Sequence, residues 1–350
     1  MTVLISTKLG EARNKQPRVW LEGRKLQREG IAPGMQYRAE FNFNSRKVTV
    51  HTAPVLANAT GNVNKRTEKR TDQEIELPLM EIRSDDFLKM FKPNESLRVV
   101  VKDGVLIITS QVTTKDGAER LQRLREKLKN KQPLAVASLF HGGGVLDRAL
   151  HTGLAKAGVD SWVQVAVELE EKYLESSLRN NHMLWRPESI LFEGSIENFS
   201  PSEKSPKCDL LIAGIPCTGA SLAGRAKNAL AQAEDHEAAG ACFYYTLIAL
   251  QHLNPSVVIL ENVRAFSSCA SMSVIRNVLR SRGYNLQERI MSGVEFGVLE
   301  ARERLCVVAT TQGLDQFDLA SVVPIRTKEA TLGEVLDDIP LDSERYTTYE

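Results

Sequence analysis

From residue 134 onward, short apolar runs alternate with stretches long enough to form amphipathic helices. The five runs are Leu134–Phe140, Trp162–Val167, Leu210–Ala213, Val257–Leu260 and Leu305–Ala309. Near-continuous apolar strands separated by helices are typical of a parallel sheet covered on both faces. We therefore predict an α/β domain over residues 134–350. Sheets of this kind bind ligands at the carboxyl ends of their strands, so functional residues are expected directly after the runs.

Residues 1–110 have a different, β-rich pattern. The order strand, short helix, turn, strand, turn, strand occurs twice, with Pro33 and Pro93 at equivalent points. Asp103-Gly104 between two alternating runs predicts a hairpin. The polar residues near 55–77 are expected to form a linker or long loop. The repeated pattern resembles the swapped-hairpin domains of AbrB-type and SymE-like DNA-binding proteins, which implies a small β-rich N-terminal domain.

Residues 111–133 predict a basic connector helix. Leu121, Leu124 and Leu128 recur at the spacing of one helix face, and Arg or Lys residues cover much of the rest. Two interpretations are open at this point. The leucines dock on a neighbouring element while the cations face solvent, or the helix contacts nucleic-acid phosphates.

Composition excludes several classes of function. The formal net charge is only +1, so contacts with nucleic acid must come from local basic clusters. Five cysteines without CxxC spacing suggest no metal site and no disulfide framework, and we expect Cys208, Cys242 and Cys306 to be buried. No run approaches the ~20 apolar residues of a membrane span, and the N-terminus lacks the pattern of a secretory signal. We expect a cytoplasmic protein without a membrane partner.

Two features point to a nucleotide-like cofactor. The first run leads into a glycine-rich turn, His141-Gly142-Gly143-Gly144, where the backbone can approach a ligand closely. The second run ends in Glu168, whose carboxylate can accept hydrogen bonds from ribose hydroxyls. No Gly-Lys-Ser/Thr follows the glycines, which counts against nucleoside-triphosphate hydrolysis. These residues alone leave both NAD and S-adenosylmethionine as candidate cofactors.

Three further strand ends carry reactive side chains. The third run ends in a Gly-Ile-Pro-Cys turn that places Cys217, a candidate nucleophile, at the ligand-binding edge. The fourth run ends in Glu261-Asn262, and Arg302 and Arg304 precede the last run at the i, i+2 spacing of one strand face. A thiol, a carboxylate and paired arginines at one edge are difficult to explain by chance.

Together these motifs resemble the DNA cytosine-C5 methyltransferase family over roughly residues 134–340. The most specific part is the pair Pro216-Cys217 and Glu261-Asn262-Val263, in this order. The resemblance implies a Rossmann-like S-adenosylmethionine-dependent methyltransferase fold and S-adenosylmethionine as cofactor. The residues that it implies in cofactor binding are Phe140, Gly142, Gly144, Glu168 and Pro216.

The resemblance also implies a mechanism on DNA. Cys217 attacks C6 of a flipped-out cytosine, and Glu261 holds and protonates N3. Arg304 contacts the base O2, and Arg302 helps to order the loop and the carboxylate. On the substrate side, the resemblance implies roles for Ser221 and Asn262. RNA cytosine methylation is left open, because one branch of the family acts on transfer RNA.

Several positions depart from the family pattern. Ser195 stands where an aspartate usually binds the adenine amino group, Thr218 stands where Gln or Glu is usual, and Glu300 replaces a Gln. The residues after Ala309 match neither the variable target-recognition domain nor the closing C-terminal motif of the family. We expect a split enzyme whose second polypeptide supplies these parts. The rival hypothesis is a truncated, inactive methyltransferase-like protein that binds DNA.

Overall fold

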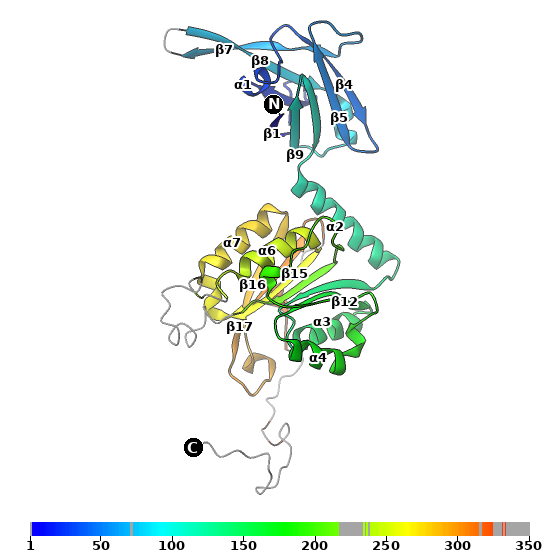
Figure 1. Ribbon diagram of the computed structural model, residues 1–350, viewed down its shortest axis with the longest axis vertical. Coiled ribbons are helices and arrows are strands. Elements are labelled where there is room, and N and C mark those ends of the chain that lie inside the picture. The colour runs from blue at the N-terminus through cyan, green and yellow to red at the C-terminus, as the bar shows by residue number, and fades with distance from the viewer. Residues whose placement is uncertain are drawn as a thin grey trace. The chain divides into compact units, whose positions relative to one another are not determined.

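The computed structural model describes residues 2–70, 73–216, 234, 236, 239–314, 317–324, 331 and 333. The chain divides into two compact units, residues 1–116 and 117–350 (Figure 1). The division falls inside helix α2 (Val112–Lys129), most of which belongs to the second unit. Most of residues 111–133, which the sequence predicts as a separate connector, therefore belongs to the second unit. No helix among the described residues is long and apolar enough to cross a membrane.

The N-terminal unit contains the predicted order of strand, short helix, strand and strand twice, with four more strands outside this order among its described residues. The first copy consists of β3 (Pro17–Glu22), α1 (Arg24–Gln27), β4 (Gln36–Asn42) and β5 (Lys47–Ala53), and β1 (Thr2–Lys8) and β2 (Gly10–Glu11) precede it. The second copy consists of β8 (Gln73–Arg83), the 3-10 helix η1 (Asp85–Lys89), β9 (Ser96–Lys102) and β10 (Val105–Ser110), and β6 (Gly61–Asn62) and β7 (Asn64–Arg70) precede it. The hairpin predicted at Asp103-Gly104 is confirmed, because β9 and β10 pair antiparallel around it.

The two copies interleave rather than lie side by side. Sheet order is β1-β9-β10-β5-β4-β6 in one sheet and β2-β3-β8-β7 in the other, so each sheet contains strands of both copies. β5 pairs antiparallel with β10, and β3 pairs antiparallel with β8. One apolar cluster, which includes Leu21, Val50, Met80 and Leu106, fills the interior of this unit. Neither copy could bury its apolar residues without the other.

The expectation of a linker near residues 55–77 is wrong. Residues 61–62 pair with β4, and β7 and β8 form a long antiparallel hairpin. The segment is polar because its charged side chains pair across the two strands and are exposed. Lys65 lies 2.6 Å from Glu76, and Lys69 lies 3.4 Å from Glu74. Cross-strand pairs of opposite charge favour a two-stranded ribbon without an apolar run.

The second unit follows the predicted alternation of strands and helices. Its strands are β11 (Leu134–Leu139), β12 (Ser161–Glu168), β13 (Ile190–Glu193), β14 (Leu210–Gly214), β15 (Val257–Val263), β16 (Tyr284–Ser292) and β17 (Glu303–Thr311). Its α-helices after α2 are α3 (Val145–Lys156), α4 (Glu171–Asn180), α6 (Cys242–Leu253) and α7 (Ala270–Ser281). Its 3-10 helices are η2 (His182–Leu184), η3 (Ile196–Asn198), η5 (Arg264–Ser268), η6 (Val294–Phe296) and η7 (Leu319–Ser321).

The seven strands form one sheet in the order β13-β12-β11-β14-β15-β17-β16. Strands β11 to β15 are parallel, as predicted, but β17 runs antiparallel to both neighbours. Only ten residues join β16 to β17, too few for a parallel crossover, so these two strands form a hairpin-like pair. The sequence expectation that the last apolar run is parallel is therefore wrong.

Helices cover both faces of this sheet. On one face, residues of α6 and α7, including Leu250 and Ile275, pack on the strands. On the other face, Leu124 of α2 and residues of α3, including Leu150, pack on the same strands. The arrangement is the Rossmann-like methyltransferase fold, and it confirms the predicted fold class. Its parallel strands place the ends of β11, β12, β14 and β15 at one edge.

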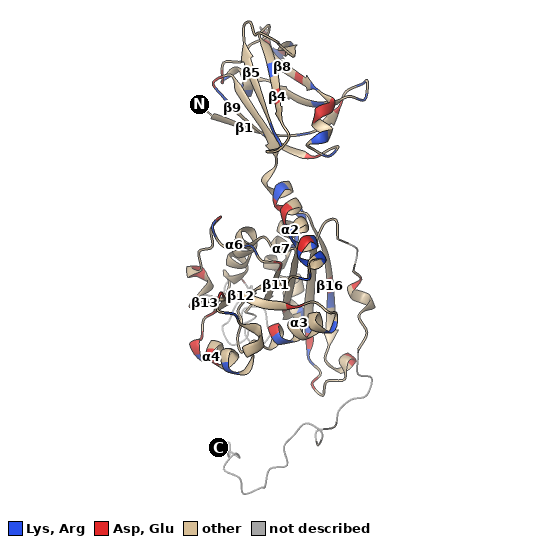
Figure 2. Ribbon diagram, turned by 90° about the vertical axis from the view of Figure 1, so that its right-hand side faces the viewer, with Lys and Arg blue, Asp and Glu red and all other residues tan. Residues whose placement is uncertain are grey.

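Helix α2 is fixed to this unit by its basic residues. Arg120 is 1% exposed and donates hydrogen bonds to Thr311 Oγ1 (2.7 Å) and to the carbonyl of Arg282 (2.6 Å). Arg123 Nε and Lys127 Nζ lie 3.1 and 2.5 Å from the carboxylate of the buried Asp209. Basic and acidic residues alternate along the helix (Figure 2), but these three cations already bind protein groups. The structure supports the docked connector and not the phosphate-contacting helix.

Candidate active site

The glycine turn and Glu168 meet at the carboxyl ends of β11 and β12. The backbone has positive φ at Phe140 (57°), Gly142 (57°) and Gly144 (75°), which folds the chain back tightly after β11. The Gly142 N–H donates to Glu168 Oε2 at 2.6 Å, and the Glu170 N–H donates to Oε1 at 3.0 Å. The structure therefore brings together the two predicted cofactor elements, although they lie 26 residues apart in the sequence.

The end of β14 leads to the predicted nucleophile. Pro216 is the last described residue of this segment, and Cys217 and Ser221 lie outside the described residues. Asn262, at the end of β15, is 3% exposed, and its side-chain amide donates to the carbonyl of Ile215 at 3.1 Å. The Val263 N–H donates to the Asn262 Oδ1 at 2.8 Å. Asn262 thus ties the backbone directly before Pro216-Cys217 to the strand that carries Glu261.

Glu261 lies beside the end of β14. In the parallel pairing of β14 with β15, Gly214 is the partner of Glu261. A Cβ atom added at Gly214 would lie 3.5 Å from Glu261 Oε2, so the glutamate side chain packs beside that position. Glycine at residue 214 leaves the carboxylate the most room beside the strand that leads to Cys217.

Arg304 holds Glu261 from the neighbouring antiparallel strand. The Arg304 Nε lies 2.8 Å from Glu261 Oε1, and the two side chains are 26% and 37% exposed. The pair is therefore open to a ligand on one side. Arg302 is exposed, and its backbone carbonyl accepts a hydrogen bond from the Gly293 N–H (2.9 Å). The structure brings Arg304 to the carboxylate but leaves Arg302, like Glu300, at the exposed surface.

Three of the other described thiols, Cys208, Cys242 and Cys306, have raised pKa values and are poor nucleophiles. Burial raises the pKa of Cys208 to about 12 and the pKa of Cys242 to about 11. Burial also raises the pKa of Cys306, and the nearby Glu261 carboxylate adds to this increase. Cys208 and Cys242 are buried as predicted, whereas Cys306 is only partly buried. A thiol that stays protonated near neutral pH does not attack a base.

Sequence reasoning missed the residues that support the glycine turn from within the protein. Asn181 donates its side-chain amide to the carbonyl of Gly143 at 3.0 Å, and His141 lies buried among Ser138, Asp147 and Ser177. No spacing rule links Ser177 and Asn181 to a turn more than 30 residues earlier. The Ser195 hydroxyl, which stands at a family aspartate position, accepts from the Glu197 N–H at the start of η3 (3.4 Å).

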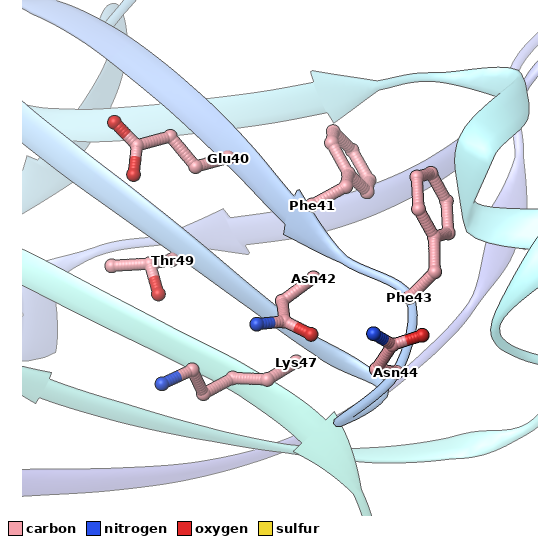
Figure 3. Close-up of a pocket in the computed structure, with 7 residues that line it drawn as sticks. All are labelled: Glu40, Phe41, Asn42, Phe43, Asn44, Lys47 and Thr49. Atoms are coloured by element: carbon pink, nitrogen blue, oxygen red, sulfur yellow. The ribbon is translucent and has the colours of Figure 1, made fainter.

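A separate hollow of about 550 Å³ lies on the N-terminal unit (Figure 3). Its lining is mostly polar and comes from β4, β5 and the turn between them, namely Glu40, Phe41, Asn42, Phe43, Asn44, Lys47 and Thr49. None of the residues predicted for chemistry lies there. Among the described residues, no group of three or more His, Cys, Asp or Glu side chains could hold a metal ion. The strand-end edge of the second unit is therefore the candidate active site.

Comparisons with known proteins address the same region. The chain is similar to the Type II methyltransferase M.Eco47II of Escherichia coli, with 29% identity over 216 residues, which are 59% of this chain and 48% of that protein. It is also similar to the Type II methyltransferase M.Bsp6I of a Bacillus strain, with 32% identity over 181 residues, 50% of this chain and 51% of that protein. The chain spans about half the length of the curated relatives it matches.

Among solved structures, the chain is similar to the Dnmt2 methyltransferase of S. pombe, with 21% identity, a TM-score of 0.41 and coverage of 57% of each chain. The fold assignment rests on the sheet order and not on this likeness. The model of the C-5 cytosine-specific DNA methylases matches residues 134–349, which include the glycine turn, the Pro216-Cys217 turn and the Glu261–Arg304 pair. The chain belongs to the C-5 cytosine-specific DNA methylase family.

Proposed function

We propose that this chain carries the catalytic residues of a DNA cytosine-C5 methyltransferase, with S-adenosylmethionine as methyl donor and Cys217 as nucleophile. One observation carries the proposal. The Glu261 carboxylate, held by Arg304 at 2.8 Å, lies beside the strand end that leads to Pro216-Cys217. An acid and a cation beside the strand end that precedes a cysteine in the sequence are the groups that covalent activation of a cytosine ring requires.

The turn after β11 fits the proposed cofactor. Positive φ at Gly142 and Gly144 folds the backbone back at the carboxyl end of the sheet, and a Cβ atom added at Gly142 would meet no atom within 4 Å, so the space beside Gly142 is open. Glu168 accepts one backbone hydrogen bond on each oxygen, and each carboxylate oxygen has a second lone pair for a ribose hydroxyl. Phe140 and Pro216 lie at the ends of the two adjacent strands. When bound, S-adenosylmethionine supplies an electrophilic methyl group.

The residues of this chain would activate the base. The Cys217 thiolate adds to C6 of cytosine, which forms an S–C6 bond and moves an electron pair toward N3 and C5. Glu261 donates a proton to N3, so that C5 becomes the nucleophile of an enamine. Arg304 stabilises the charge that develops at the base edge. After methylation, loss of the C5 proton to a base and departure of Cys217 restore the C5–C6 double bond.

DNA is the proposed substrate, and an RNA cytosine is the alternative. The N-terminal unit, residues 1–116, contains 20 Lys and Arg against 14 Asp and Glu. Its net charge of +6 favours binding to a polyanion, whereas residues 117–350 carry 25 Lys and Arg against 30 Asp and Glu. A cytosine stacked in a duplex is closed to Cys217, so the base must flip out. The relatives' designation as Type II methyltransferases favours a role in restriction-modification.

Transfer of a radioactive methyl group tests this function. Purified protein is incubated with labelled S-adenosylmethionine and, in separate reactions, with duplex DNA, transfer RNA or buffer alone. We expect label in DNA at C5 of cytosine and none in RNA. Label in transfer RNA alone would establish the RNA alternative. If neither is labelled, each reaction is repeated with the product of the adjacent reading frame, since a second polypeptide is proposed to supply target recognition. Continued absence of label would refute the catalytic proposal.

A further inference from the structure

A closed cluster of polar side chains lies inside the protein, directly beneath the glycine turn. His141, the residue between Phe140 and Gly142, has a fully buried side chain. Its Nδ1 lies 2.9 Å from Ser138 Oγ and 3.1 Å from Asp147 Oδ2, and its Nε2 lies 2.7 Å from Ser177 Oγ. The imidazole therefore joins β11 and α3 on one side to α4 on the other.

The hydrogen bonds on both imidazole nitrogens of this cluster can form at once, although the Asp147 Oδ1 has no partner among the described residues. Asn181 donates to the Gly143 carbonyl (3.0 Å) and to Ser177 Oγ (3.3 Å), which leaves the Ser177 hydroxyl proton for His141 Nε2. A neutral imidazole that accepts at Nε2 carries its proton on Nδ1, and this proton points toward Ser138 and Asp147. Buried polar groups paired in this way favour one arrangement of the backbone to which they bond.

That arrangement sets the shape of the turn. A Cβ atom added at Gly144 would lie 2.4 Å from Ser177 Oγ and 2.9 Å from both Asn181 Nδ2 and His141 Nε2. The cluster thus presses against the turn from within, and the Asn181 amide fixes the Gly143 peptide. On the other side, Glu168 holds the Gly142 N–H. The turn is clamped between the cluster and the carboxylate.

We propose that His141 is a positioning residue for the methyl donor. Through Ser177 and Asn181 it holds the glycine turn in the shape that binds the cofactor, without touching the cofactor itself. The inference deepens the proposed function and rests on it, because it takes the turn as the S-adenosylmethionine site. Ordering the turn before binding avoids an entropy cost that the cofactor would otherwise have to offset.

The test is a calorimetric titration of the full chain with S-adenosylhomocysteine, together with steady-state kinetics. In His141→Ala we expect the Kd of S-adenosylhomocysteine and the KM of S-adenosylmethionine to rise about tenfold, with kcat at saturation nearly unchanged. His141→Asn, which keeps an N–H near the position of Nδ1, should recover part of the affinity. Ser177→Ala should weaken binding as His141→Ala does. The double variant should bind only slightly more weakly than either single variant, because both substitutions remove the same His141–Ser177 contact.

His151→Ala is the matched control. His151, in α3, is also buried, but its Nδ1 contacts Ser161 at 2.5 Å and not the turn. The control should lose stability without a change in Kd. A folded His141→Ala protein with wild-type Kd would overturn the inference, and so would equal weakening by His151→Ala. If His141→Ala fails to fold, an unchanged Kd in Ser177→Ala overturns it. Failure of the wild type to bind would instead refute the proposed function.

Discussion

Replacement of Arg304 by Ala should separate catalysis from stability. The Arg304–Glu261 pair is 2.8 Å long, but its side chains are 26% and 37% exposed. Partly exposed ion pairs contribute only about 0–1 kcal/mol to folding, so the free energy of unfolding should fall by about 1 kcal/mol or less. Loss of a group that stabilises charge in the transition state costs about 10²–10³ in kcat. We therefore expect a large loss of activity in a protein that is nearly as stable as the wild type.

Arg276→Ala is the matched control. Arg276 pairs with Glu288 at 2.6 Å, its side chains are 22% and 24% exposed, and the pair lies between α7 and β16, away from Glu261. It should lose as much stability as Arg304→Ala, or more, and keep kcat within about twofold. Urea denaturation gives the stabilities, and single-turnover methyl transfer gives the rates. Equal activity loss in the two variants, or an Arg304→Ala protein destabilised by about 3 kcal/mol or more, would refute the reasoning.

Three further predictions concern the same unit. Native protein treated with iodoacetamide near neutral pH should stay unlabelled at Cys208 and Cys242, because their pKa values are raised to about 12 and 11. Peptide mass spectrometry that finds either cysteine alkylated before denaturation would contradict this prediction. Burial lowers the pKa of His151 below 6.5 in the folded protein. As the pH falls below 6.5, His151 is therefore protonated in the unfolded chain before it is protonated in the folded one, and the free energy of unfolding decreases. His151→Asn should reduce that loss between pH 7.5 and 5, measured by urea denaturation. Arg120→Ala leaves several buried acceptors unpaired and should cost about 3 kcal/mol or more; a change below about 1 kcal/mol would show that α2 is not fixed through this residue.

The pattern of apolar runs predicted most of the catalytic unit, because buried parallel strands have a strong and local signal. All five predicted runs are strands of one sheet. The antiparallel direction of β17 could not be predicted from its residues, because a short continuous apolar run such as Leu305–Ala309 gives the same pattern in either direction. The order of β16 and β17 in the sheet is likewise a matter of tertiary packing. β16 itself, with its partly exposed residues, was not predicted.

In the N-terminal unit, the sequence repeat predicted the repeated elements and the β9–β10 hairpin, but not how the two copies pair with each other. The polar β7–β8 hairpin was interpreted as a linker because charged residues usually indicate a solvated segment. Its strands are stabilised by cross-strand ion pairs such as Lys65–Glu76, which periodicity does not detect. Whether this unit binds DNA, as its resemblance to AbrB-type proteins implies, stays a prediction.

At the site, local motifs predicted Gly142, Glu168, Glu261 and Arg304, which the structure brings together in two contacting pairs. Long-range contacts beneath the site were not predictable. The hydrogen bonds of His141 depend on residues of α4 that no motif connects to the glycine turn. Cys217 and Ser221 lie outside the described residues, so their predicted roles rest on the sequence and on the strand end before them.

Capture of a covalent intermediate tests the central claim most directly. The chain is incubated with S-adenosylmethionine and duplex DNA that contains 5-fluorocytosine, alone and with the adjacent reading frame's product, and the mixture is run on a denaturing gel. With fluorine at C5 there is no C5 proton for a base to remove, so Cys217 cannot leave after methyl transfer. We predict an adduct whose peptide maps to Cys217 and which Cys217→Ser does not form. No adduct in either reaction, or an adduct that persists in Cys217→Ser, would contradict the account.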